Sequence, residues 1–87
     1  MMLPRVTAVE IVDNKTLQLT FDNDEVRRFI ISAYLQYPVY NPLNNPIFFA
    51  SAKAFNGTVV WGDAIDFAPE TLYLESEPIE KGVSSTQ

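Results

Sequence analysis

The chain has 87 residues, a formal net charge of −5 at pH 7, and neither histidine nor cysteine. Without these residue types it cannot build a Ser-His-Asp triad, a Cys-His pair, an ordinary zinc site or a disulfide framework. The length predicts one domain with a small core, in which eleven phenylalanine, tyrosine and tryptophan residues supply much of the burial.

The acidic excess lies near the C-terminal end. Up to Val60, five acidic residues balance five basic ones, whereas residues 61–87 hold six acidic residues and one lysine. Nucleic-acid binding depends on Lys and Arg side chains that neutralise phosphates, so this balance argues against direct nucleic-acid binding. No apolar run has the length of a signal peptide or a membrane span, and we therefore expect a cytoplasmic protein with no membrane partner.

The first part of the chain predicts a three-stranded antiparallel meander. Residues 5–12 are rich in β-branched side chains, and residues 16–21 alternate apolar with polar side chains, the period of a half-buried strand. The polar residues 22–25 predict a tight turn before a third strand over residues 26–31. Arg27 has the inward parity near one end of that strand, where its guanidinium can reach water.

Short helical turns are expected next. Ser32 is the predicted N-cap of one turn through residues 33–36. Three prolines spaced four residues apart predict an irregular loop over residues 37–46. Asn45 can cap a short helix with Pro46 as its first residue.

The strongest local signal is Asn56-Gly57, because both residue types tolerate the positive φ of a type I′ hairpin turn. With these two residues as the loop, directly opposed residues share a face of the sheet. One face then carries Ala52, Ala54, Val59 and Trp61, and the other carries Lys53, Phe55, Thr58 and Val60. The alanines leave room for the indole, so Trp61 is predicted to be the centre of the core.

The last predicted elements follow this hairpin. Gly62 should interrupt the strand, which resumes over residues 63–67 with Ile65 and Phe67 inward. Pro69 and Glu70 then begin a short helix that Leu72 and Tyr73 anchor. The prediction is a single α+β domain over residues 1–75, followed by a disordered acidic or polar tail over residues 76–87. It comprises the meander, short helical turns, the β-hairpin and a short C-terminal helix.

Three carboxylates close in sequence, Asp63, Asp66 and Glu70, form one candidate site. Brought together by a turn, they could hold a divalent cation or supply a general acid. Strand geometry points Asp63 and Asp66 to opposite faces, and a glutamate in a first helical turn more often serves the helix dipole. We therefore assign no catalytic, cofactor-binding or metal-binding residue, and keep an enzyme or metal-binding protein as the alternative.

The aromatic, proline-rich segment is a second candidate site, because exposed aromatic residues on a stiff loop are typical of protein interfaces. The alternative is that these rings close one end of the core. A small-ligand site beneath the loop, lined by Tyr34, Tyr40 and Trp61, is a third possibility. Unpaired strand edges could also bind a strand from another protein or a second copy. The candidate interaction residues are Tyr34, Tyr37, Tyr40, Phe48 and Phe49.

These patterns together resemble a widespread family of short bacterial proteins catalogued only as a domain of unknown function. The resemblance covers nearly all of the chain before the tail, and its most specific part is the ending from Trp61 to Tyr73. It rests on Val6 and Val9, Leu17-x-Leu19-x-Phe21, Pro42-Leu43, Phe49, Val59-Val60-Trp61, Asp66, Pro69 and Leu72-Tyr73.

The resemblance implies an α+β fold and a bacterial, cytoplasmic setting, with no catalytic residues to carry over. Members often lie beside another small protein in an arrangement similar to a toxin–antitoxin pair, and some relatives carry a helix-turn-helix, which is not predicted here. Ile30 and Ala68 depart from the aspartate and the capping serine usual in the family. The leading hypothesis is a non-enzymatic interaction module, accessory or antitoxin-like, with a protein partner or a second copy.

Overall fold

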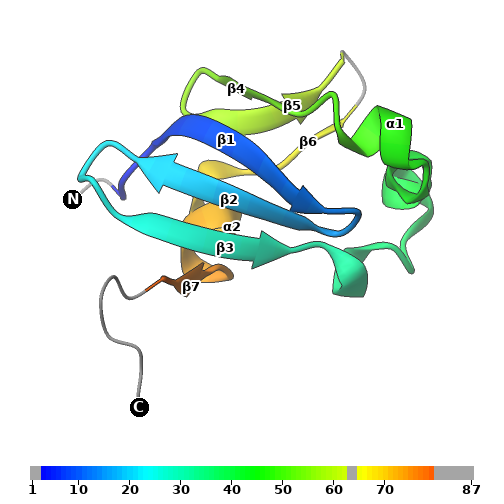
Figure 1. The fold of residues 1–87 in the computed structure, drawn as a ribbon, viewed down its shortest axis with the longest axis horizontal. Coiled ribbons are helices and arrows are strands. Elements are labelled where there is room, and N and C mark those ends of the chain that lie inside the picture. Colours follow the sequence, from blue (N-terminus) through cyan, green and yellow to red (C-terminus); the bar gives the residue numbers. More distant parts are fainter. Residues whose placement is uncertain (1–2, 63–64, 80–87) are drawn as a thin grey trace.

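The computed structural model describes residues 3–62 and 65–79, and it has the predicted α+β class (Figure 1). Within these ranges, no helix has the length and apolar character needed to cross a bilayer. The elements in chain order are β1 (Val6–Asp13), β2 (Thr16–Phe21), β3 (Val26–Ile30), the 3-10 helices η1 (Ser32–Tyr34) and η2 (Pro38–Asn44), α1 (Pro46–Phe49), β4 (Lys53–Phe55), β5 (Thr58–Trp61), β6 (Ile65–Asp66), α2 (Pro69–Leu74) and β7 (Glu77–Pro78).

The predicted meander forms an antiparallel sheet with the strand order β1-β2-β3-β7. The alternation in β2 buries Leu17, Leu19 and Phe21 on one face, as expected for a strand that covers a core on one side. The pairing of β1 with β2 is irregular at two points, between Val6 and Ala8 and between Ile11 and Asp13. The predicted strands are confirmed, with their ends shifted by at most one residue.

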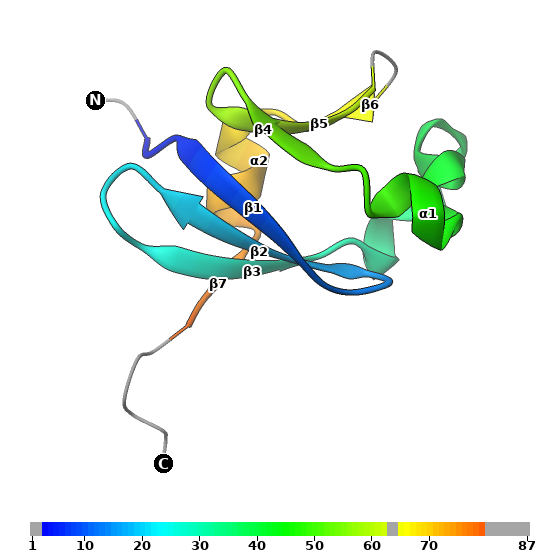
Figure 2. The ribbon, with the colours of Figure 1, turned by 45° about the horizontal axis from the view of Figure 1, so that its top comes forward.

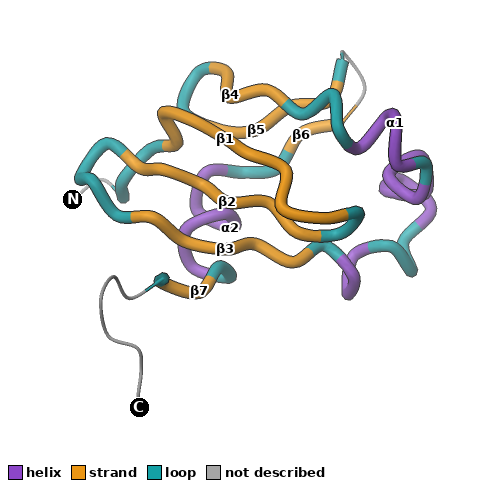
Figure 3. The backbone as a smooth tube through the Cα atoms, in the orientation of Figure 1, coloured by secondary structure: helices purple, strands orange, loops and turns teal. Residues whose placement is uncertain are grey.

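The predicted hairpin forms a second antiparallel sheet with the strand order β4-β5-β6. Its turn lies against the start of the first sheet, where the Val6 N–H donates to the Gly57 carbonyl at 3.0 Å. In Figure 2, α2 spans the space between the two sheets near this turn. The helical segments η1, η2 and α1 gather at the opposite end (Figure 3). The hairpin therefore has one face towards the core and one face away from it.

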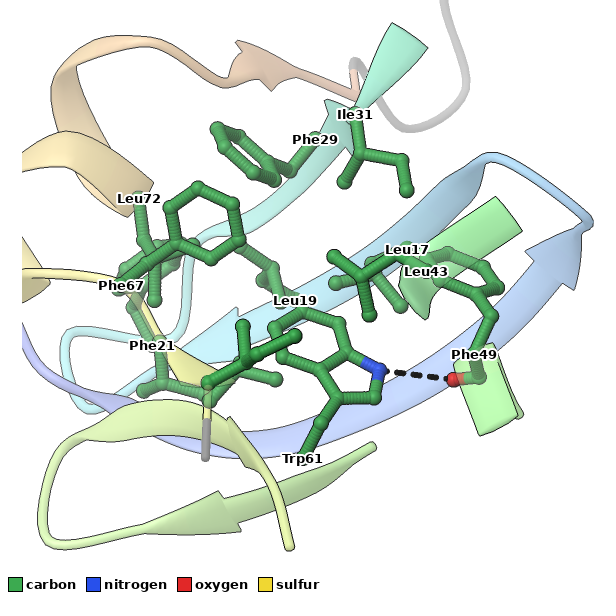
Figure 4. Packing of buried hydrophobic residues seen from close by; sticks show 13 residues of the cluster. Leu17, Leu19, Phe21, Phe29, Ile31, Leu43, Phe49, Trp61, Phe67 and Leu72 are labelled. Atoms are coloured by element: carbon green, nitrogen blue, oxygen red, sulfur yellow. Dashed lines mark hydrogen bonds between the residues drawn. The ribbon is translucent and has the colours of Figure 1, made fainter. Parts of the chain in front are cut away.

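The core lies between the two sheets, and Trp61 is at its centre with no exposed surface (Figure 4). Its indole Nε1–H donates to the main-chain carbonyl of Phe49 at 2.9 Å, which satisfies the one polar group of the ring. Ala52 and Ala54 are partly buried against the same cluster. The prediction that Trp61 is the centre of the core is confirmed.

Two local predictions in the middle of the chain are wrong. Ser32 is the first residue of η1 rather than its N-cap, because the Tyr34 N–H bonds to the Ile31 carbonyl and the turn begins one residue earlier. The segment expected to be an irregular loop contains η2, whose first residue is Pro38. Proline tolerates that place because its φ is already helical and its missing N–H is not needed there.

The ordered domain extends beyond the predicted boundary at residue 75. Ser76 is buried, and β7 pairs with β3 through Arg27 opposite Pro78 and Arg28 opposite Glu77. The Ile79 N–H also donates to the Val26 carbonyl at 2.9 Å. The segment has little to bury, so its attachment depends on hydrogen bonds to β3. The rest of the predicted tail, residues 80–87, lies outside the described residues.

Candidate interaction surface

The β4–β5 hairpin has the predicted turn and register. Asn56 and Gly57 have φ values of 56° and 86°, as a type I′ turn requires. Phe55 faces Thr58, Ala54 faces Val59 and Lys53 faces Val60. The Arg5 guanidinium holds the turn from outside by donating from Nη2 to the Asn56 carbonyl at 2.6 Å.

This register puts an aromatic side chain on the face that points away from the core. Phe55 is 65% exposed, whereas Trp61 on the inner face is fully buried. Lys53 is exposed and Val60 half-buried on the same outer face as Phe55, since they oppose each other in the register. Asp66 on β6 lies opposite Val60 and is exposed. We call the surface formed by Lys53, Phe55, Val60 and Asp66 the outer face.

A groove of about 430 Å³ lies on the outer face, with Lys53, Phe55 and Val60 in its lining. Phe48 and Ser51, from the end of α1 and the segment after it, form one part of its lining. Ile47, in the same short helix, is 83% exposed. Asn45 holds this helix in place, because its Oδ1 accepts from the Ile47 and Phe48 N–H groups. The groove is lined by Phe48, Ser51, Lys53, Ala54, Phe55, Val60 and Gly62.

Two of the five predicted interaction residues close the end of the core. Tyr40 stacks on Phe67 with ring centroids 4.8 Å apart, and Tyr34 packs edge-on against both rings. Burial is the main cause that raises the pKa of the Tyr34 hydroxyl above its ordinary value. Both tyrosines pack against the core cluster, and the groove has neither Tyr34, Tyr40 nor Trp61 in its lining.

The other three predicted residues have different surroundings. Phe49 is fully buried and stacks on Trp61 with ring centroids 6.1 Å apart, so its assignment to a surface is wrong. It anchors α1 to the core because its carbonyl accepts the indole N–H. Tyr37 is 51% exposed, and Phe48 is half-buried and lines the groove. The structure therefore brings only Phe48 into the groove.

The structure describes two of the three candidate carboxylates, and these two lie on different elements. Asp66 lies on the outer face, and Glu70 lies in the first turn of α2. Asp63 lies outside the described residues, so the three-carboxylate site stays a prediction. Among residues 3–62 and 65–79, no group of three His, Cys, Asp or Glu side chains is placed to hold a metal ion.

A polar cluster joins the β2–β3 turn to the C-terminal segment. Arg27 donates from Nε to Ser76 Oγ at 2.8 Å and from Nη1 to Glu25 Oε1 at 3.0 Å, and its guanidinium lies 4.5 Å from the Tyr73 ring centroid. Tyr73 donates to Glu25 Oε2 at 2.8 Å. This bond is the largest cause that lowers the pKa of Glu25 and raises the pKa of Tyr73, and Arg27 lowers the Glu25 pKa further.

Comparison with protein families matches residues 6–78 to the family described as Protein of unknown function (DUF2442). The chain belongs to the DUF2442 family. The match runs from the first residue of β1 to the last residue of β7, so both sheets belong to the DUF2442 unit. The resemblance to a family catalogued as a domain of unknown function is thereby confirmed. Neither the curated proteins nor the solved structures gave a match.

The outer face of this DUF2442 chain was not predicted as a surface, although the sequence contains a signal for it. The Asn56-Gly57 register already sets Lys53, Phe55 and Val60 on the face opposite Trp61. A hairpin whose two faces both carry a large aromatic residue can bury only one of them against a single small core. The exposed Phe55 follows from that register, whereas the groove depends on α1, which no local pattern places beside β4.

Proposed function

We propose that this chain is a non-enzymatic protein-interaction module that binds its partner through the outer face and the groove on it. The observation that carries the proposal is the exposed Phe55 ring in the wall of a mostly apolar groove. Protein interfaces are enriched in aromatic side chains, which bury a large area with few rotatable bonds. Phe55 and Phe48 supply such rings, and Lys53 supplies a charge at the rim.

The residue types support a role in binding rather than catalysis. The sequence has no histidine or cysteine to act as a base or a nucleophile. Hydrogen bonds to main-chain and side-chain donors lower the pKa of Asp13, and hydrogen bonds from Tyr73 and Arg27 lower that of Glu25. A carboxylate acting as a general acid near neutral pH needs the opposite shift.

The proposal includes a cytoplasmic setting and an accessory or antitoxin-like role. The absence of cysteine is in keeping with a reducing compartment. The acidic balance supports a protein rather than a nucleic acid as the binding partner.

Site-specific photo-cross-linking in the native host cells tests this proposal. A photoreactive side chain replaces Phe55 in one variant and Glu10, an exposed residue of β1, in the control. We expect protein cross-links from position 55 and few from position 10. The additional substitution Lys53→Asp should reduce the yield from position 55. No cross-link from position 55, or equal yields from both positions, would contradict the proposal.

A further inference from the structure

The outer face carries two opposite charges on either side of an apolar residue. Lys53 opposes Val60, and Val60 opposes Asp66, so the three residues form one row across β4, β5 and β6. Neighbouring strands lie about 4.8 Å apart, so the lysine and the aspartate are separated by about 10 Å at the backbone. Among the described residues, neither side chain takes part in an ion pair.

The row has the arrangement that a twofold symmetric interface requires. A rotation of 180° about an axis along β5 exchanges the positions of β4 and β6. Two outer faces packed against each other about this axis would bring Lys53 of each copy against Asp66 of the other, with the two Val60 side chains at the centre. Such an interface is self-complementary, as isologous dimers are.

The neighbouring positions on the outer face are complementary in size. Phe55 opposes Thr58, whose hydroxyl donates to the Phe67 carbonyl, and Ala68 follows Phe67 at the start of α2. The same rotation sets the exposed Phe55 ring of one copy over the small, exposed Ala68 of the other. On β5, Thr58 is buried and Val60 is half-buried, so the middle strand carries no large exposed side chain and two sheets can approach to the usual packing distance of about 10 Å.

We infer that the partner of the outer face is a second copy of this chain, bound as a symmetric dimer through reciprocal Lys53–Asp66 pairs and the Phe55 ring. This inference rests on the proposed function and names its partner. The face is that of a short three-stranded sheet, so its area places the dimer among weak and reversible complexes. Raising the salt concentration should weaken it, because both ion pairs lie at the rim.

Charge reversal in matched variants tests the dimer by sedimentation over a wide concentration range. In a dimer of Lys53→Asp chains, the aspartate at position 53 of each copy would face Asp66 of the other. In a dimer of Asp66→Lys chains, the lysine at position 66 of each copy would face Lys53 of the other. We expect each variant alone to dimerise at least about tenfold more weakly than the wild type. An equimolar mixture of the two should recover dimers, since the heterodimer restores both pairs. The double variant K53D/D66K should also recover them.

Both substitutions are at exposed positions, and circular dichroism with thermal melting verifies that each variant is folded. A wild type that stays monomeric at every concentration, or single variants that dimerise like the wild type, would overturn the inference. So would a mixture that remains monomeric. Cross-linking at position 55 separates this result from the proposed function. A cross-linked species of twice the chain's mass supports the dimer, and a species formed only with another polypeptide supports the proposed function alone. The absence of any cross-linked species would contradict both.

Discussion

The Trp61 indole N–H donates to the Phe49 carbonyl across the core, and this bond joins the hairpin to the end of α1. A buried indole N–H without an acceptor would be costly, so the bond holds α1 at one place relative to β5. Phe48, the preceding residue of α1, is thereby held at the wall of the groove. The inner face of the hairpin thus determines the shape of the surface on its outer face.

Removing the cap of α1 should loosen the groove wall. Asn45→Ala deletes the side-chain oxygen that accepts from the Ile47 and Phe48 N–H groups, and we expect a loss of about 1 kcal/mol in the free energy of unfolding. Asn45→Asp keeps an accepting oxygen and serves as the control. Urea denaturation measures both. Equal stability of Asn45→Ala and the wild type would show that the cap contributes nothing.

The two glycines with positive φ should respond differently to alanine. Alanine at either position would be forced into a left-handed conformation at a cost of about 1 kcal/mol or more, since Gly57 has a φ of 86° and Gly62 a φ of 60°. A Cβ at Gly57 would also clash with the Arg5 guanidinium and push it away from the Asn56 carbonyl to which it donates, whereas one at Gly62 meets nothing within 4 Å. We therefore expect Gly57→Ala to lower the free energy of unfolding more than Gly62→Ala.

A double-mutant cycle with Arg5 isolates the contact from the backbone strain. In an Arg5→Ala background the guanidinium is absent, so Gly57→Ala should cost about as much as Gly62→Ala. If Gly57→Ala lowers the free energy of unfolding equally in the wild type and in the Arg5→Ala background, the contact between Arg5 and the turn is contradicted.

The carboxylate of Glu25 should contribute to stability in a pH-dependent way. Its folded pKa is lowered from 4.5, first by the Tyr73 hydroxyl and then by Arg27. A lowered pKa means that the stabilisation is present above pH 4.5 and is lost as the pH falls through the folded value. In Tyr73→Phe, the Glu25 pKa should rise towards 4.5, as followed by NMR titration of its side-chain carboxyl carbon. An unchanged pKa in this variant would be inconsistent with the hydrogen bond.

The Tyr73→Phe substitution should also change how stability depends on pH. Near neutral pH it should be less stable than the wild type, and the difference should shrink as the pH falls below the folded pKa of Glu25, because both proteins then carry a neutral carboxyl. A difference that is independent of pH would instead reflect packing of the ring.

Removing β7 should destabilise the domain even though it has little apolar surface. A chain ending after Glu75 loses Ser76, which accepts two hydrogen bonds from Arg27, and loses the pairing with β3. We expect a loss of about 2 kcal/mol, as for hydrogen bonds to a charged group. A chain ending after Ile79 keeps every described bond and is the control. Identical urea midpoints for the two truncations would contradict a structural role of β7.

The predictable parts of the fold are those that short-range chemistry determines. Asn56-Gly57 sets the hairpin register, the alternation in residues 16–21 sets the buried face of β2, and Asn45 and Pro69 mark helix starts. Each of these depends on a few adjacent residues, so the pattern is visible in the sequence.

The parts that could not be predicted depend on contacts between distant residues. The attachment of β7 relies on bonds between Arg27 and Ser76, which are 49 positions apart. The burial of Phe49 relies on Trp61, although the adjacent Phe48 has the same side chain and reaches the surface. The sequence predicts the interaction surface on the proline segment, where aromatic residues are dense. It cannot show which of these rings are exposed, because that depends on tertiary packing.

The hairpin register turns Trp61 inward and Phe55 outward, and both the core and the outer face depend on it. Fluorescence of Trp61, the only tryptophan, tests it directly through the emission maximum and quenching by acrylamide in the folded and the guanidinium-unfolded protein. We expect a blue-shifted, weakly quenched emission that becomes red-shifted and strongly quenched on unfolding. An emission in the folded protein like that of free tryptophan in buffer would contradict it.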